Sequence, residues 1–371
     1  MTFDNRIRLR ARTVDPRTPR PHTPVTNLTI VTDLAWPAFR NVASDIQNAL
    51  QPYCRCQVVD WKEAMPGGNI LFVQTIRKDT LKLLKKLLSG SRIVFYGTTE
   101  GHSLLDAESI QIAKNINIVA VSSFVKEMLE EVGLSVAGVV HHGVDMDAKE
   151  VDAAFLQSCA EKLGEKLVSL TIAKNDCRKG LETLLRAYKH VEGEIPHSFG
   201  ILHSEPNQFD EGGGRTRRQG AYDLPELVSK LGIKRIWLTN RHGLLTPGEV
   251  NALYKLCQIY VLSSYSEGFG LPMLEAFRFH KPVVAVDAPP FNEIIEHGKT
   301  GILIPCVEVQ WFNHKNKVLF KMHKYEHGCL AEAIIRLLSN TALRDKIGIH
   351  IQKSKYRWSI HNLYPKLLKY F

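Results

Sequence analysis

Short apolar segments alternate with amphipathic helical ones from Leu28 nearly to the end of the chain. The apolar segments are near-continuous runs, which is typical of parallel strands that are buried on both faces. In the first half they are LTIVTD, NILFVQ, RIVFYG, NIVAVS and VAGVVHHG. Because a parallel strand pair requires a crossover connection, usually a helix, the alternation predicts an α/β fold built from doubly wound parallel sheets.

The chain has 371 residues, which exceeds one ordinary core and favours two domains. The alternation pauses at about 145–166 and resumes with KLVSLTI, SFGILHS, RIWLT, IYVLSS, PVVAVD and GILIP. We therefore expect Rossmann-like domains at 25–150 and 151–355, facing each other across a cleft. Residues 1–24 contain six arginines and four prolines without apolar periodicity, and are predicted to be a mobile basic tail.

Composition limits the cellular compartment and the chemical class of partner that we expect. Seven cysteines without a C-x-x-C pair favour reduced thiols, and no apolar run approaches the roughly 18–20 residues of a membrane span. The N-terminus lacks an apolar signal region, so we expect a cytoplasmic protein. A net charge of +10 favours an anionic partner, either nucleic acid, an anionic membrane or a phosphorylated small molecule. No nucleic-acid-binding motif accompanies the charge, so no nucleic acid is expected.

The segment TLKLLKKLLSGSR, residues 80–92, leaves two interpretations open. Leu81, Leu84 and Leu88 form one stripe, and lysines lie opposite. The first interpretation is a crossover helix that packs on the first sheet. The second is a peripheral contact with an anionic membrane, to which the basic C-terminal tail would add.

The stretch SSYSEGFGLPMLEAFRFHKPVV, residues 263–284, contains the strongest candidate site. It follows the predicted strand IYVLSS, and Pro272 is expected to be the first residue of the next helix. Gly268 and Gly270 allow close approach of a ligand, and the helix N-terminus favours an anion. Glu267 and Glu275 flank this turn and would accept hydrogen bonds from sugar hydroxyls, so the pattern suits a nucleoside-diphosphate sugar. For an isolated motif, a corner with solvated surface glutamates is the alternative.

The E-x7-E pattern within GFGLPxLEA, followed by PVVA and HGKTG, resembles the family-4 retaining glycosyltransferases, also called glycosyl transferase group 1. The resemblance extends from about Lys166 to Phe371. It implies the GT-B fold, with a last helix at about 356–371 that packs back on the first domain. It also implies that Glu267 contacts the transferred sugar and Glu275 the ribose. The donor would also meet the turn and the start of the helix, at Gly268, Phe269, Gly270 and Leu271.

A second match is TIAKNDCRKGLETLLRAY, residues 171–188. The family usually has an arginine and then Lys-Gly, and the two cations clamp the diphosphate. Lys179 and Gly180 fit the second position, whereas Lys174 stands where the arginine is usual and lacks its bidentate grip. Two solvated lysines before a helix are the alternative interpretation.

Other resemblances are weaker. The first domain is expected to bind the acceptor, and its segment TDLAWPAF has Trp36 where family members often have a Gly-Gly loop. His142 in HHGVD replaces a usual asparagine, and Glu293 in PPFNEIIEHGKTG is expected near the nucleotide. The family often has a catalytic histidine near the sugar, for which TTEGH offers His102, with Glu100 beside it. Trp36, Glu100 and His142 are thus the acceptor-side candidates.

Two alternative metal sites are disfavoured. Asp145 and Asp147 have D-x-D spacing, but Asp145 is explained by the HGVD turn. His314, His323, His327 and Cys329 have ligand chemistry, but their segment is interpreted as a basic surface insertion. No metal or other cofactor is therefore expected to be required.

The predicted activity is retaining transfer of a hexose, mannose or glucose, from a nucleoside-diphosphate sugar to a glycan, lipid-linked or small-molecule acceptor. The alternatives of the same fold are a sugar phosphorylase and a nucleotide-sugar epimerase. From other classes, a noncatalytic partner in an assembly and a nucleic-acid binder are the competing hypotheses.

Overall fold

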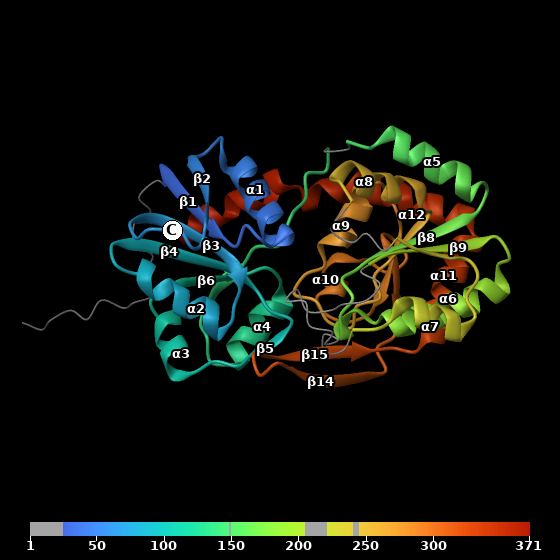
Figure 1. Cartoon of the computed structure of the whole chain (residues 1–371). Helices are drawn as coiled ribbons and strands as arrows, with labels where there is room; N and C mark the ends of the chain where they lie inside the picture. The colour runs from blue at the N-terminus through green and yellow to red at the C-terminus, as the bar shows by residue number, and fades with distance from the viewer. Residues whose placement is uncertain (1–24, 148–149, 205–220, 240–244) are drawn as a thin grey trace, which may run out of the picture.

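A computed structural model of the chain describes residues 25–147, 150–204, 221–239 and 245–371. The tail predicted for residues 1–24 lies outside the described residues. Two lobes, each built on a parallel six-stranded sheet, lie side by side, as Figure 1 shows. The predicted α/β architecture is therefore confirmed.

The first sheet contains the five strands predicted for the N-terminal half and one edge strand that was missed. Its order is β2 (Arg55–Asp60), β1 (Asn27–Thr32), β3 (Gly68–Thr75), β4 (Ser91–Thr98), β6 (Asn117–Ala120) and β7 (Val136–Val139). The missed strand is β2, whose side chains are exposed or half-buried. An edge strand with this burial lacks the continuous apolar run by which the others were found. The helical segments between the strands are α1 (Pro37–Leu50), α2 (Lys78–Leu84), η1 (Lys85–Leu87), α3 (Ala107–Ala113) and α4 (Ser123–Glu131).

The second sheet has the same all-parallel character. Its order is β10 (Ile236–Leu238), β9 (Ser198–His203), β8 (Leu167–Ile172), β11 (Ile259–Val261), β12 (Val283–Val286) and β13 (Gly301–Ile304). The chain order reverses between the paired strands β8 and β11. In an open α/β sheet, ligands bind beyond the carboxyl ends of the strands at such a reversal. The helical segments of this lobe are α5 (Ala153–Leu163), η2 (Cys177–Lys179), α6 (Leu181–Glu194), α7 (Leu224–Leu231), α8 (Pro247–Leu256), α9 (Leu271–Arg278), α10 (Phe291–Ile294), α11 (His327–Ser339) and α12 (Thr341–Ser354).

A third, antiparallel sheet takes strands from both lobes. The hairpin of β14 (Glu308–His314) and β15 (Val318–Lys324) leaves the second lobe and pairs with β5 (Gly101–Ser103) of the first. It runs along the lower edge of the molecule in Figure 1. The sequence had suggested a basic surface insertion for this segment. That interpretation missed the hairpin, whose inner strand β15 buries Val318, Phe320 and Met322.

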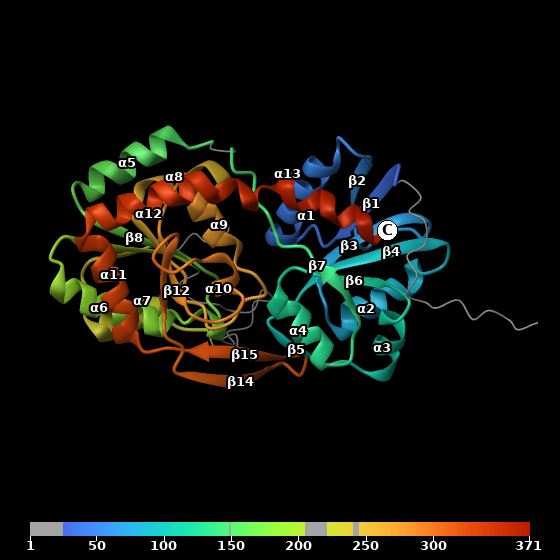
Figure 2. The same ribbon diagram turned by 180° about the vertical axis from the view of Figure 1, so that it is seen from behind.

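The end of the chain returns to the first lobe through η3 (Lys355–Trp358), α13 (Ile360–Leu363) and η4 (Tyr364–Tyr370). These elements lie beside α1, as both Figure 1 and Figure 2 show. The Asn117 side-chain amide donates to the Tyr370 carbonyl, at 2.7 Å. The C-terminal segment therefore ties the second lobe to the first.

The leucine stripe of residues 80–92 belongs to the core of the first lobe. Leu81 and Leu84 of the predicted stripe are buried, as is Leu87 beside it, and Leu88 is half-buried against the same core. On the outer side, the Lys82 ammonium lies 2.8 Å from Asp106 and 2.9 Å from Glu108. This burial supports the crossover-helix interpretation, because a stripe used in the core offers no apolar face to a bilayer.

Candidate functional site

The turn between β11 and α9 lies at the reversal of the second sheet, against the end of β4 in the first lobe. The helix begins at Leu271, one residue before the predicted Pro272, and its cap Gly270 has φ = 99°. Glycine is favoured at such a left-handed position. At Gly268, a Cβ atom would lie 1.8 Å from Thr98 Oγ1, and the Gly268 carbonyl accepts a 2.7 Å hydrogen bond from Ser122. The two lobes thus meet at the predicted donor turn, and glycine makes the close approach there possible.

Glu267 is buried, with 8% of its surface exposed, and is surrounded by donors. Its carboxylate accepts hydrogen bonds from Arg178 Nη1 at 2.8 Å, from Ser264 Oγ at 2.7 Å and from the Lys179 ammonium. Burial would raise the pKa of Glu267, but Lys179 and Arg178 outweigh it and lower the pKa to about 2. Glu267 is therefore ionised at neutral pH.

The loop after β8 brings these cations to Glu267. The Asp176 carboxylate accepts a hydrogen bond from the Arg178 amide at 3.1 Å, which starts η2. Gly180 follows with φ = 61°, and a Cβ atom there would lie 2.2 Å from the Ser263 carbonyl oxygen. A glycine at this position therefore lets the β8 loop pack against the β11 loop.

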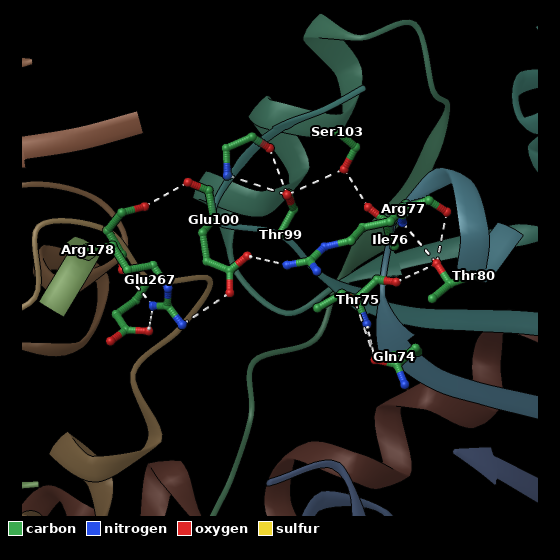
Figure 3. A network of polar contacts seen from close by, with 12 residues as sticks. Gln74, Thr75, Ile76, Arg77, Thr80, Thr99, Glu100, Ser103, Arg178 and Glu267 are labelled. Atoms are coloured by element: carbon green, nitrogen blue, oxygen red, sulfur yellow. Dashed lines mark hydrogen bonds and ion pairs between the residues drawn. The ribbon is translucent and has the colours of Figure 1, made fainter. Parts of the chain in front are cut away.

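Arg178 is the site residue that the sequence analysis missed. Its guanidinium lies between Glu267 of the second lobe and Glu100 of the first, with Nη2 3.4 Å from Glu100 Oε1. Figure 3 shows this chain of contacts. Burial would lower the pKa of Arg178, but Glu267 and Glu100 raise it, so its charge is permanent. The sequence signal is the arginine directly before Lys179, whereas the resemblance places the family's arginine at Lys174.

Lys174 faces the other lobe. Its ammonium lies over the ring of Trp36, which is about half exposed just before α1. The structure thus brings together two predicted residues, one from the cation clamp and one from the acceptor side. Their roles stay predictions.

Glu275 lies one turn inside α9, where it is half-buried. Its Oε2 accepts a 2.7 Å hydrogen bond from the phenol of Tyr254, a residue of α8. Burial and the negative charge of Glu275 raise the pKa of Tyr254 well above its usual value, so the phenol stays a donor. The hydrogen bond fixes the direction of the carboxylate, and its contact with a ribose stays a prediction.

Glu293, expected near the nucleotide, contacts the first lobe. Its carboxylate accepts hydrogen bonds from the amides of Ser123 at 2.8 Å and Phe124 at 2.9 Å, at the start of α4. His141 Nε2 lies 3.1 Å from the same carboxylate. Burial would raise the pKa of Glu293, but these partners lower it. In this structure the residue is a helix cap across the domain boundary.

The two histidines singled out by the resemblance lie apart from each other. His102 on β5 pairs with Glu131, and its ring centre lies 4.4 Å from that of Trp311 on β14. His142 is buried, and its Nδ1 lies 3.0 Å from the Tyr96 hydroxyl. Burial lowers the pKa of His142 to about 3, so its ring is neutral. Its ring also packs edge-on against Phe269 of the donor turn.

The described part of the chain contains no group of three His, Cys, Asp or Glu side chains arranged to hold a metal ion. Across the same residues, no helix has the length and apolar character of a membrane span.

Comparison with known proteins points to one family. Residues 238–327 match the family described as "Glycosyl transferases group 1", a range that includes Glu267, Glu275 and Glu293. A glycosyltransferase, numbered 335, of Sulfolobus islandicus rod-shaped virus 1 is 22% identical over 287 residues, which cover 74% of this chain and 79% of the viral protein. The serotype-specific mannosyltransferase WbdA of Escherichia coli is 28% identical over 155 residues; the match covers 41% of this chain but 18% of WbdA.

Solved structures agree in fold. HepE of Anabaena, crystallised in complex with UDP-glucose, superposes with a TM-score of 0.68 at 16% identity, covering 93% of this chain and all of HepE. A sucrose-phosphate synthase from Thermosynechococcus elongatus superposes with a TM-score of 0.64 at 14% identity, covering 92% and 97% of the two chains. The protein is thus a glycosyltransferase with the GT-B fold, and its residues 238–327 match the glycosyl transferase group 1 family.

Proposed function

We propose that the protein transfers a hexose from a nucleoside-diphosphate sugar with retention of configuration at the anomeric carbon. The observation that supports this best is the buried, ionised Glu267 held by Arg178 and Lys179 at the start of α9. A carboxylate accepts hydrogen bonds from sugar hydroxyls, while two cations and a helix N-terminus suit a diphosphate. The site therefore suits both the sugar and the diphosphate of a nucleotide sugar.

In the proposed reaction, these cations stabilise the diphosphate as its bond to the sugar breaks. Charge develops on the leaving diphosphate, and fixed cations in a water-poor site stabilise that charge more than they would in water. The acceptor hydroxyl attacks the face from which the diphosphate departs, and the leaving oxygen takes the acceptor proton. Configuration is thereby retained without a covalent intermediate.

The surroundings of Glu267 argue against its use as a covalent nucleophile. In retaining glycosidases one carboxylate attacks the anomeric carbon. Glu267 instead shares its oxygens among Arg178, Lys179 and Ser264, and a pKa of about 2 makes it a weak base. This environment suits binding of the sugar and favours front-face displacement.

The similar proteins suggest two donors for a first test. HepE was crystallised with UDP-glucose, and WbdA is a mannosyltransferase. We therefore include glucose and mannose as the candidate sugars, with a glycan, lipid-linked or small-molecule acceptor on the side of Trp36.

The test combines binding and turnover. Thermal unfolding is followed with GDP, UDP, ADP and the corresponding nucleotide sugars. A ligand at 100 times its Kd adds about 2.7 kcal/mol to the free energy of unfolding. Release of nucleotide is then measured for Glu267→Gln, where we expect a loss of about 100-fold. The matched control is Glu226→Gln, a carboxylate of α7 that pairs with Lys230 on the surface. Unchanged turnover in Glu267→Gln, or conversion of the donor into another nucleotide sugar without an acceptor, would overturn the proposal.

A further inference from the structure

Glu100 lies at the boundary between the lobes, between β4 and β5, and is fixed there by its backbone. Its carbonyl oxygen accepts a 2.7 Å hydrogen bond from Ser266 Oγ, next to Glu267 in the donor turn. The same oxygen accepts a 3.1 Å hydrogen bond from the Lys321 amide of β15. A first-lobe residue is thus anchored by two elements of the second lobe.

The side chain of Glu100 lies between two arginines. Its Oε1 is 3.4 Å from Arg178 Nη2, and its Oε2 is 3.5 Å from Arg77 Nη2, as Figure 3 shows. Glu100 has 9% of its surface exposed, and Oε2 is buried without a direct hydrogen bond. The carboxylate therefore acts on the two guanidinium groups mainly through charge, in surroundings where charge is weakly screened.

Arg178 transmits this interaction to the donor site. Its Nη1 donates to Glu267 Oε2 at 2.8 Å and to the Ser266 carbonyl at 3.0 Å, while Nη2 faces Glu100. A planar guanidinium held at both ends has one orientation, whereas a guanidinium held at one end can turn about its side-chain bonds. Arg178 thus connects Glu100 of the first lobe with Glu267 of the second.

We propose that Glu100 is a positioning residue that orients Arg178 across the domain boundary, so that the donor site is complete when the first lobe is docked on the second. The inference rests on the proposed function of Glu267 and Arg178, and deepens it. Arg77 has a supporting role, because it balances the second oxygen of Glu100.

The experiment measures kcat and KM for nucleotide release from whichever of UDP-glucose and GDP-mannose the wild-type protein turns over. For Glu100→Gln we expect kcat to fall about tenfold while KM changes by less than about threefold, since the groups that bind the donor are still present. Glu100→Asp keeps the charge and is expected to recover part of the loss. In an Arg178→Lys background, Glu100→Gln is expected to cause little further loss, because the residue through which it acts is already changed.

Asp79→Asn is the matched control. It removes another ion pair between the lobes, from Asp79 to Lys317 of the hairpin at 2.8 Å, on the surface and away from Arg178. If Asp79→Asn lowers kcat as much as Glu100→Gln, or if the effects of Glu100→Gln and Arg178→Lys simply multiply, Glu100 acts on interdomain packing alone and the inference is overturned. Failure of the wild-type protein to turn over any donor would instead refute the proposed function.

Discussion

The ammonium nitrogen of Lys174 lies 4.8 Å from the centre of the Trp36 ring, so a cation of the second lobe rests on an aromatic ring of the first. The two lysines of the TIAKNDCRKG segment therefore lie in different surroundings, because the ammonium of Lys179 contacts Glu267. A cation–π contact at an exposed site contributes about 0.5–1 kcal/mol. Removal of one partner from a buried ion pair costs more, about 3–5 kcal/mol.

We expect Lys179→Met to lose most of the stabilisation that UDP gives in thermal unfolding, and Lys174→Met to keep most of it. The reason is that Lys179 shares the buried site of Glu267, whereas Lys174 faces Trp36. Lys230→Met, on the surface of α7, serves as the control for loss of a positive charge. An equal loss in Lys174→Met and Lys179→Met would mean that Lys174 binds the diphosphate as the usual arginine does.

Glu293→Ala is expected to lower the free energy of unfolding by about 1–2 kcal/mol in chemical denaturation without ligand. The change removes the carboxylate that caps α4 from the other lobe, and loss of a helix cap costs about that much. Glu130→Ala, at the exposed end of the same helix, should change it by less than about 0.5 kcal/mol. Equal effects of the two substitutions would contradict the capping role.

Asp45→Asn is expected to stabilise the protein at alkaline pH. Burial raises the pKa of Asp45 to about 7; Arg278 opposes this increase, and Asp145 and Glu275 add to it. In the unfolded chain an aspartate titrates near pH 4, so folding becomes less favourable as the pH rises from about 4 to about 7. At pH 8 the variant should therefore be more stable by roughly 1–3 kcal/mol, after allowance for partial exposure.

The pH dependence separates this effect from a general change in packing. Denaturation of Asp45→Asn and the wild-type protein is compared from pH 4 to pH 8. The gain should be absent near pH 4, grow up to about pH 7 and stay constant above. A difference that does not change with pH would show that ionisation of Asp45 is not its cause.

Gly268→Ala is expected to abolish donor turnover, since the added methyl group would lie 1.8 Å from Thr98 Oγ1 and push the lobes apart. Gly193→Ala near the end of α6 is the control, because nothing lies within 4 Å of a Cβ atom there. That substitution should be neutral or stabilise by up to about 1 kcal/mol, because alanine is the better helix former. Full nucleotide release by Gly268→Ala would mean that turnover does not need the lobes in contact at this turn.

Most of both sheets was predictable because their strands are continuous apolar runs. The turn between β11 and α9 was predictable because Glu267, Gly268 and Gly270 lie within four consecutive residues. The edge strand β2 was missed because its side chains are partly exposed, and the β14–β15 hairpin because its outer strand is mostly exposed.

The contacts of Arg178 and Glu293 depend on how the lobes dock. Glu100 is 78 positions before Arg178 in the numbering, and Glu293 caps a helix that starts 170 positions earlier. No local pattern encodes such partners, because propensity and periodicity describe neighbours along the chain. The resemblance places the family's arginine at the position of Lys174. In this chain, however, the guanidinium beside Glu267 belongs to Arg178.

The hairpin that joins β5 has a consequence for how this enzyme can vary. Phe320 is paired with Gly101, and Val318 with Ser103, in an antiparallel ladder that spans the two lobes. A slip of one residue in such a ladder moves one strand by about 3.3 Å and turns its side chains to the opposite face. The ladder therefore allows only discrete registers, and the register in this structure is one that buries Val318 and Phe320. Because a slip by one residue would turn these buried side chains outward, a change in the length of the hairpin is taken up more easily in its turn, residues 315–317, than in the ladder between the lobes.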